Sequence, residues 1–205
     1  MVAGFGLTAQ LVLVVSGASV LVTEDPPDLA DRLLRLVSYF TIQSNVAVAL
    51  TALTLVRDPD RDGPRWRVLR LDAIVGITVT GVVHWFLLRP LLHLTGWSYA
   101  TDKLLHVVVP AMAVLGWLAF GPRPRVSLRV VLLSLVWPAA WLAYTLAMGV
   151  VTGWYPYPFL DVGLQGGGTV AIASVGVALG MFACAALVWL VDRLLGRRQS
   201  GVSSG

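Results

Sequence analysis

The sequence predicts an all-α, polytopic membrane protein, a bundle of six transmembrane helices that uses residues 1–198 as one domain. Of the 205 residues, 57% are hydrophobic and 13% are charged, whereas soluble domains carry about 25% charged residues. The mean hydropathy is +0.79. Several uncharged runs are long enough to cross a hydrocarbon core of about 30 Å, and the alternating pattern of a membrane β-barrel is absent. These runs are residues 1–23, 36–56, 73–88, 104–122, 130–160 and 162–191.

The first three helices are expected at 3–22, 34–56 and 70–89. We interpret the first as a retained helix and not as a signal peptide, because no Arg or Lys precedes its apolar stretch. The second coincides with the uncharged run that ends before Arg57. The third ends at Arg89 and Pro90, since proline interrupts helical hydrogen bonding.

The last three helices are expected at 103–120, 127–150 and 168–191. The fourth stops before a Gly-Pro pair. The fifth is followed by residues 154–161, where Pro156 and Pro158 remove backbone donors, so we expect a structured lid or hairpin there. Three glycines precede the sixth helix. The Gly/Ser-rich residues 199–205 are expected to form a disordered tail.

Charge placement predicts that both termini face the cytoplasm. Basic residues gather in 57–67, in 121–125 and after the sixth helix, while the opposite loops carry acids and interfacial aromatics. The net charge of +4 does not indicate nucleic-acid binding, because the basic residues stand at the ends of apolar runs. Cys184 is the only cysteine, which excludes an intramolecular disulfide.

Three polar residues share one face of the predicted second helix. Ser38, Thr41 and Asn45 are spaced i, i+3 and i+7. Interhelical hydrogen bonds of roughly 0.6 kcal/mol each account for such a stripe when it is considered alone.

Depth in the membrane links Thr41 to two histidines. At 1.5 Å per residue, Thr41 lies about 10 Å below the outer end of the second helix, and His106 lies about 5 Å along the fourth. His84 is about one and a half turns below the outer end of the third helix. An ionisable group inside a span indicates a candidate functional site, although a single histidine also commonly bonds to a neighbouring helix.

These residue types suit nucleophilic catalysis. A hydroxyl becomes a nucleophile when a base removes its proton, so Thr41 and His106 could form a dyad. Asp102, four residues before His106, could orient the imidazole or could instead cap the fourth helix. Asn45 could donate to an oxyanion or join two helices. Ser44 is a second candidate nucleophile.

A zinc site is the competing arrangement. His84, His106 and a carboxylate from Asp102 or Asp161 could leave one open coordination position. The chain has no HExxH spacing, and both acids fall in predicted loops. We therefore expect no metal and no other cofactor.

Three segments resemble the androgen-induced (FAR-17a-like) six-pass membrane family, and its bacterial branch in particular. They are Tyr-Phe-Thr-Ile-Gln-Ser-Asn at 39–45, Leu-His-Val-Val-Val-Pro at 105–110 and the Tyr-Pro-Phe-Leu-acid stretch within 151–161. The resemblance covers nearly the whole chain. It implies a threonine hydrolase that cleaves fatty acid esters of hydroxy fatty acids, with Thr41 and His106 at the matching catalytic positions. Asp102 and Ser44 depart from the animal pattern, which has Asn and an acid there.

The leading interpretation is an intramembrane esterase whose partners are a lipid ester and the surrounding lipids. Tyr157 and Asp161 could contact the substrate, while the aromatics of 154–161 could equally anchor the chain at the headgroups. The alternative is a non-enzymatic lipid-binding or small-molecule transport protein. A transporter is disfavoured because no inverted repeat and no paired intramembrane charges are evident.

Overall fold

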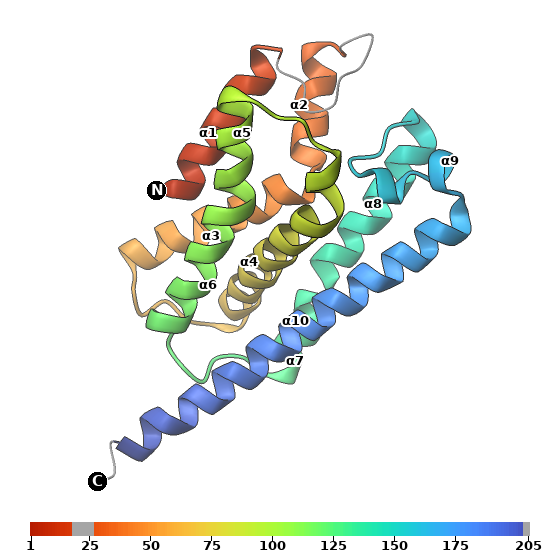
Figure 1. Cartoon of the computed structure of the whole chain (residues 1–205). Coiled ribbons are helices and arrows are strands. Elements are labelled where there is room, and N and C mark those ends of the chain that lie inside the picture. Colours follow the sequence, from red (N-terminus) through yellow and green to blue (C-terminus); the bar gives the residue numbers. More distant parts are fainter. Residues whose placement is uncertain (18–26, 203–205) are drawn as a thin grey trace. The chain divides into compact units, whose positions relative to one another are not determined.

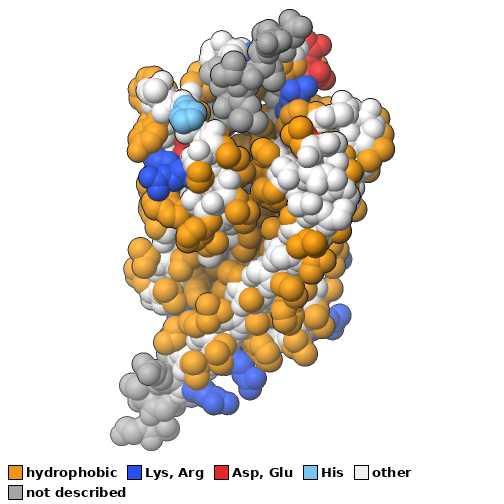
Figure 2. Space-filling model, turned by 45° about the vertical axis from the view of Figure 1, so that its right-hand side comes forward, with side chains coloured by type: hydrophobic (Ala, Val, Ile, Leu, Met, Phe, Trp, Pro, Cys, Tyr) orange, Lys and Arg blue, Asp and Glu red, His pale blue; other side chains and the backbone are white. Residues whose placement is uncertain are grey.

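The computed structural model describes residues 1–17 and 27–202, with side chains up to residue 197. The described residues form helices joined by loops and contain no strand, which confirms the all-α class. Within the described residues, five helical stretches are long and apolar enough to cross a membrane. Hydrophobic side chains are spread over the face shown in Figure 2. The chain is therefore an integral membrane protein. The five stretches are Phe40–Arg57, Pro64–Leu91, Gly96–Phe120, Leu128–Thr152 and Gly167–Arg197.

The first helix, as far as the described residues show it, is shorter than the predicted span of residues 3–22. Helix α1 covers Val2–Val15, and its 14 residues rise about 21 Å, less than a hydrocarbon core of about 30 Å. Residues 18–22 of the predicted helix lie outside the described residues. Six transmembrane helices therefore stay a prediction.

The chain forms two compact units, Met1–Arg61 with Gly76–Ala119, and Asp62–Val75 with Phe120–Gly205. In the first unit, α1 packs against α2, α3, α5 and η3 (Figure 1). The buried side chains of Ala3, Ile77 and Val109 form a core cluster there. The first unit contains α2 (Leu29–Ser38), α3 (Phe40–Arg57), the end of α4 (Pro64–Val83), η1 (His84–Leu88), η2 (Arg89–Leu91), α5 (Gly96–Lys103), η3 (Leu104–Val108) and α6 (Val109–Phe120).

The predicted second helix is divided at Tyr39, which corrects the expectation of one helix over 34–56. Tyr39 is extended, with φ −67° and ψ 127°. Helix α2 carries three charges in ten residues, whereas α3 carries none before Arg57. The two segments therefore suit different environments. Ser38 consequently ends α2 and does not share a face of α3 with Thr41.

The predicted fourth helix begins earlier than expected, at Gly96 in place of residue 103. Thr95 is its N-cap residue, and the helical path continues through α5, η3 and α6 to Phe120. Asp102 therefore lies inside a helix and does not cap it, which corrects its placement in a loop. His106 is ten residues from the start, about 15 Å along by helical rise and not about 5 Å.

In the second unit, α10 packs against α7, α8, η4 and α9 (Figure 1). The predicted fifth helix is divided at Leu135, because Pro138 has no N–H to donate to the carbonyl of Ser134. Helix α10 extends past the predicted end at residue 191 to Val202, and residues 203–205 of the predicted tail lie outside the described residues. Besides the first part of α4, the elements of this unit are α7 (Leu128–Ser134), α8 (Val136–Thr152), η4 (Pro158–Leu160), α9 (Val162–Gln165) and α10 (Gly167–Val202).

A buried carboxylate fixes the loop before α7. Asp192 on α10 is 1% exposed, and its Oδ2 accepts hydrogen bonds from the backbone N–H groups of Arg125 at 2.8 Å and Val126 at 2.9 Å.

A second carboxylate of this unit, Asp62, accepts a hydrogen bond from Arg67 and forms an ion pair with Arg125 at 2.8 Å. The Arg67 hydrogen bond holds the pKa of Asp62 below its ordinary range.

Replacing Asp192 with alanine should destabilise the folded protein by roughly 1–3 kcal/mol, because two buried backbone donors lose their acceptor. The measurement is the free energy of unfolding in mixed detergent micelles. Asp60→Ala is the matched control, since Asp60 is an exposed acid in the loop after α3. Equal stability of the two variants would contradict this anchoring role.

Candidate active site

Both histidines of the predicted site lie in wide π-helical turns, a feature common at functional sites. His84 begins η1, and His106 is the middle residue of η3. Proline follows each turn, because Pro110 cannot donate to the carbonyl of His106 and Pro90 cannot donate to that of Phe86. The missing helical bonds favour the wider turns that carry the two imidazoles.

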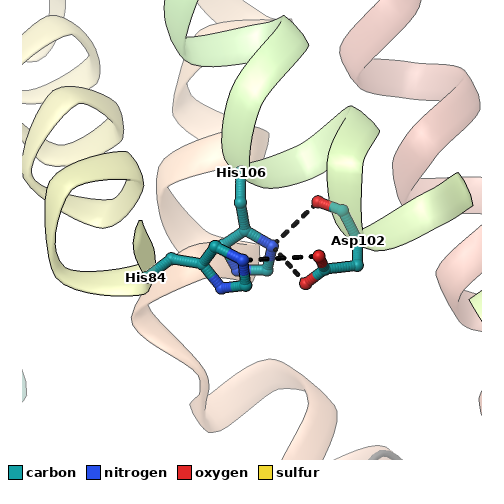
Figure 3. A group of neighbouring side chains, drawn as sticks. All are labelled: His84, Asp102 and His106. Carbon is teal, nitrogen blue, oxygen red and sulfur yellow. Dashed lines mark hydrogen bonds and ion pairs between the residues drawn. The ribbon is translucent and has the colours of Figure 1, made fainter. Parts of the chain in front are cut away.

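The backbones of α4 and η3 approach closely beside these turns. A Cβ atom on Gly81 would lie 3.1 Å from the carbonyl oxygen of His106. Glycine at this position lets α4 bring His84 next to His106. Their rings stack with centroids 3.9 Å apart and planes inclined by 15° (Figure 3).

Thr41 and His106 are within hydrogen-bonding distance. Thr41 is the second residue of α3, so the break at Tyr39 places it near the helix start and not about 10 Å along. Its Oγ1 lies 3.2 Å from Nε2 of His106. The Thr41 residue is 6% exposed, and the His106 side chain is 15% exposed. A hydroxyl and an imidazole thus meet in a nearly buried setting.

Asp102 lies on the other side of the His106 ring. The Nδ1 atom of His106 is 3.1 Å from Oδ1 of Asp102 and 3.0 Å from its backbone carbonyl oxygen. Two acceptors at Nδ1 favour the tautomer with a proton there, which leaves the Nε2 lone pair free to accept the hydroxyl proton of Thr41. The geometry therefore matches a Thr-His-Asp relay.

Lys103 balances the Asp102 charge, a role that the sequence did not indicate. Its Nζ donates to Oδ2 of Asp102 at 2.8 Å. The same Oδ2 is 3.3 Å from Nε2 of His84, and Figure 3 shows both imidazoles facing the carboxylate. With the ammonium beside the carboxylate, both histidines can stay neutral without leaving a buried charge uncompensated.

The other polar residues of α3 have structural partners. Asn45 donates through Nδ2 to the carbonyl oxygens of Thr41 at 2.8 Å and Leu105 at 3.3 Å. Both amide hydrogens are thereby used, and they join α3 to η3. Ser44 is fully buried and accepts a hydrogen bond from Thr80 at 3.4 Å. Within the described part of the chain, Ser44 forms no hydrogen bond with His106.

Three further predicted site residues lie elsewhere in the chain. Ser38 donates to the carbonyl oxygen of Leu34 at 2.7 Å. Tyr157 is a buried residue of the second unit whose ring stacks on Phe159 with centroids 5.4 Å apart. Asp161, in the same unit, caps α9 by accepting from the backbone N–H of Leu164 at 3.1 Å. Asp161 thus has a local structural role.

No family model, no curated protein and no solved structure matches this chain.

Proposed function

We propose that this protein is an intramembrane threonine hydrolase that cleaves a lipid ester. The observation that carries the proposal is that His106 contacts Thr41 through one ring nitrogen and Asp102 through the other, in a nearly buried part of the first unit. A nucleophile, a base and a group that orients the base are the parts that acyl transfer requires.

The residues act in two steps. His106 Nε2 takes the hydroxyl proton as Thr41 Oγ1 attacks the ester carbonyl carbon, and the tetrahedral intermediate collapses as the leaving alcohol takes that proton from Nε2. This step leaves an acyl ester on Thr41 and a neutral His106. In the second step, His106 Nε2 removes a proton from water and the hydroxide attacks the acyl carbon. The fatty acid leaves as Nε2 returns that proton to Thr41 Oγ1, which restores the hydroxyl group and the neutral His106.

The resemblance to the FAR-17a-like family supports the substrate class. It suggests fatty acid esters of hydroxy fatty acids, which are long apolar molecules with one internal ester. The helices of this protein are long and apolar. An apolar substrate dissolves in the bilayer more readily than in water, so it can reach such a protein from within the membrane. We propose, in addition, that the chain forms a bundle of six transmembrane helices.

A fluorophosphonate probe tests the proposal directly. The purified full chain should react covalently with the probe, and peptide mass spectrometry should locate the adduct on Thr41. Thr41→Ala should lose the adduct, whereas Ser44→Ala should keep it. A folded wild-type protein that stays unlabelled, or that carries the adduct elsewhere, would contradict the mechanism and favour a lipid-binding protein.

We also propose that both termini and the loop between α3 and α4 face the cytoplasm. Arg57, Arg61, Arg65 and Arg67 in and around this loop support the orientation. In a Cys184→Ser background, an impermeant thiol reagent added to intact cells should label Asp28→Cys and spare Asp60→Cys. Labelling of Asp60→Cys alone would invert the orientation.

A further inference from the structure

His84 is a buried imidazole whose ring nitrogens form no well-aligned hydrogen bond among the described residues. The residue is 1% exposed, and neither Nδ1 nor Nε2 meets hydrogen-bond geometry. Its Nε2 nevertheless points at the Asp102 carboxylate from 3.3 Å (Figure 3). A buried imidazole whose one contact with a carboxylate does not meet hydrogen-bond geometry needs an explanation. The proposed relay does not use this imidazole.

The nitrogen of His84 belongs to a set of three donor atoms. A ring nitrogen of His84, a carboxylate oxygen of Asp102 and a ring nitrogen of His106 lie within 4.8 Å of one another. The Nε2 atom of His84 lies 3.3 Å from Oδ2 of Asp102, and Nδ1 of His106 lies 3.1 Å from the other carboxylate oxygen, Oδ1. Tetrahedral zinc with bonds of about 2.0–2.1 Å places neighbouring ligand atoms about 3.3–3.4 Å apart. Each imidazole thus lies about one zinc ligand-to-ligand separation from an oxygen of the carboxylate, and the three groups are close enough to converge on one ion after local adjustment.

We propose that His84, Asp102 and His106 bind a divalent transition metal ion of the zinc type, and that the bound ion inhibits the hydrolase. Two imidazoles and one carboxylate are a ligand set that zinc accepts with a fourth position open. The binding part of the proposal stands on the cluster alone. The inhibitory part rests on the proposed function.

Inhibition follows from the tautomer of His106. A metal ion at Nδ1 takes the lone pair of that nitrogen, so the proton of the neutral ring resides on Nε2. Nε2 then donates to Thr41 Oγ1 and cannot accept the hydroxyl proton. The metal-bound state and the state that activates Thr41 exclude each other.

Coordination requires two local adjustments. The imidazole lone pairs lie in the ring planes, and the stacked rings are inclined by only 15°, so the rings must rotate about their Cβ–Cγ bonds to converge on one ion. Lys103 must also leave Oδ2 of Asp102. Its side chain is 26% exposed, and a long aliphatic stem lets the ammonium move to the interface.

Titration with Co²⁺ tests the site without any assay of activity, because tetrahedral Co²⁺ complexes absorb visible light. The purified full chain should bind one Co²⁺, and Zn²⁺ should displace it. His84→Ala and Asp102→Asn should each weaken binding at least about 100-fold, since loss of even an outer partner of a metal ligand costs 10–100-fold. Thr41→Ala is the matched control, because Thr41 contacts Nε2 of His106 and not the proposed ligand atom Nδ1. It should bind Co²⁺ with the affinity of the wild type. Binding by His84→Ala at wild-type affinity would overturn the proposal.

X-ray absorption at the zinc edge of the wild-type protein decides the question if those variants do not fold. The expected shell contains nitrogen and oxygen at about 2.0–2.1 Å with the outer scattering of two imidazoles. A shell of oxygen alone would overturn the site.

The inhibitory part has a separate readout. Saturating Zn²⁺ should slow fluorophosphonate labelling of Thr41 at least tenfold in the wild type and should leave the labelling rate of His84→Ala unchanged. Equal slowing in both proteins would refute inhibition through this site. If the wild type is never labelled, the hydrolase proposal fails, and the Co²⁺ titration alone decides the metal site.

Discussion

Alanine at Thr41 or at His106 should lower the rate of ester hydrolysis at least about a thousandfold, and the double variant should be no slower than either single variant. The nucleophile and its base act as one unit, so removing the second member costs little once the first is gone. The 3.2 Å contact between Thr41 Oγ1 and His106 Nε2 is the structural reason for this non-additivity.

The measurement is turnover of a fatty acid ester of a hydroxy fatty acid by purified variants in detergent micelles. Ser44→Ala is the matched control, because Ser44 is a fully buried hydroxyl on the same helix that bonds to Thr80. It should keep turnover within a few-fold of the wild type. Full activity in folded Thr41→Ala, or complete loss in Ser44→Ala alone, would assign the nucleophile elsewhere.

Spacing predicted which side chains meet better than it predicted where the helices begin. Asp102 and His106 are four residues apart, so they share a helix face wherever the helix starts. The depth estimates depended on the helix starts, and both starts were wrong. The start of α3 moved towards Thr41, and the start of α5 moved away from His106. The residues still meet, because tertiary packing and not helix length sets their approach.

Two features of the site had no clear signal in the sequence. Lys103 follows Asp102 directly, and adjacent helical residues normally diverge, yet its long side chain reaches back to Oδ2. The break at Tyr39 has no proline or glycine beside it. The contrast in charge between α2 and α3 was visible, but it does not specify the residue at which the helix ends. The π-helical turns did have a signal, since Pro90 and Pro110 lie in apolar runs or at their ends.

Replacing the Asp102 carboxylate with an apolar group should slow turnover more than replacing it with a neutral amide. Asp102→Leu should lower kcat about 100-fold, which equals about 3 kcal/mol, the upper value for a hydrogen bond to a charged group. Asp102→Asn should lower kcat only about tenfold. The backbone carbonyl of residue 102 still accepts from His106 Nδ1 at 3.0 Å in either variant, so the catalytic tautomer persists.

This expectation differs from that for a triad in which the carboxylate is the sole acceptor, where the same change to asparagine costs about 10⁴-fold. Neutralising Asp102 removes the charge that stabilises the imidazolium formed when His106 takes the Thr41 proton, and that charge is already offset by Lys103 at 2.8 Å. The KM should change little in both variants. Asp102 contacts Nδ1 of His106, on the opposite edge of the ring from Thr41, and so is not expected to contact the substrate.

Lys103→Met and Asp161→Asn complete the series as controls. Lys103→Met keeps the carboxylate and should retain more activity than Asp102→Leu, while Asp161→Asn changes only the cap of α9 and should retain wild-type kcat. Turnover by Asp102→Leu within twofold of the wild type would show that the carboxylate does not assist the base. A loss of about 10⁴-fold in Asp102→Asn would show that the backbone carbonyl does not hold the tautomer, and that the carboxylate alone orients His106.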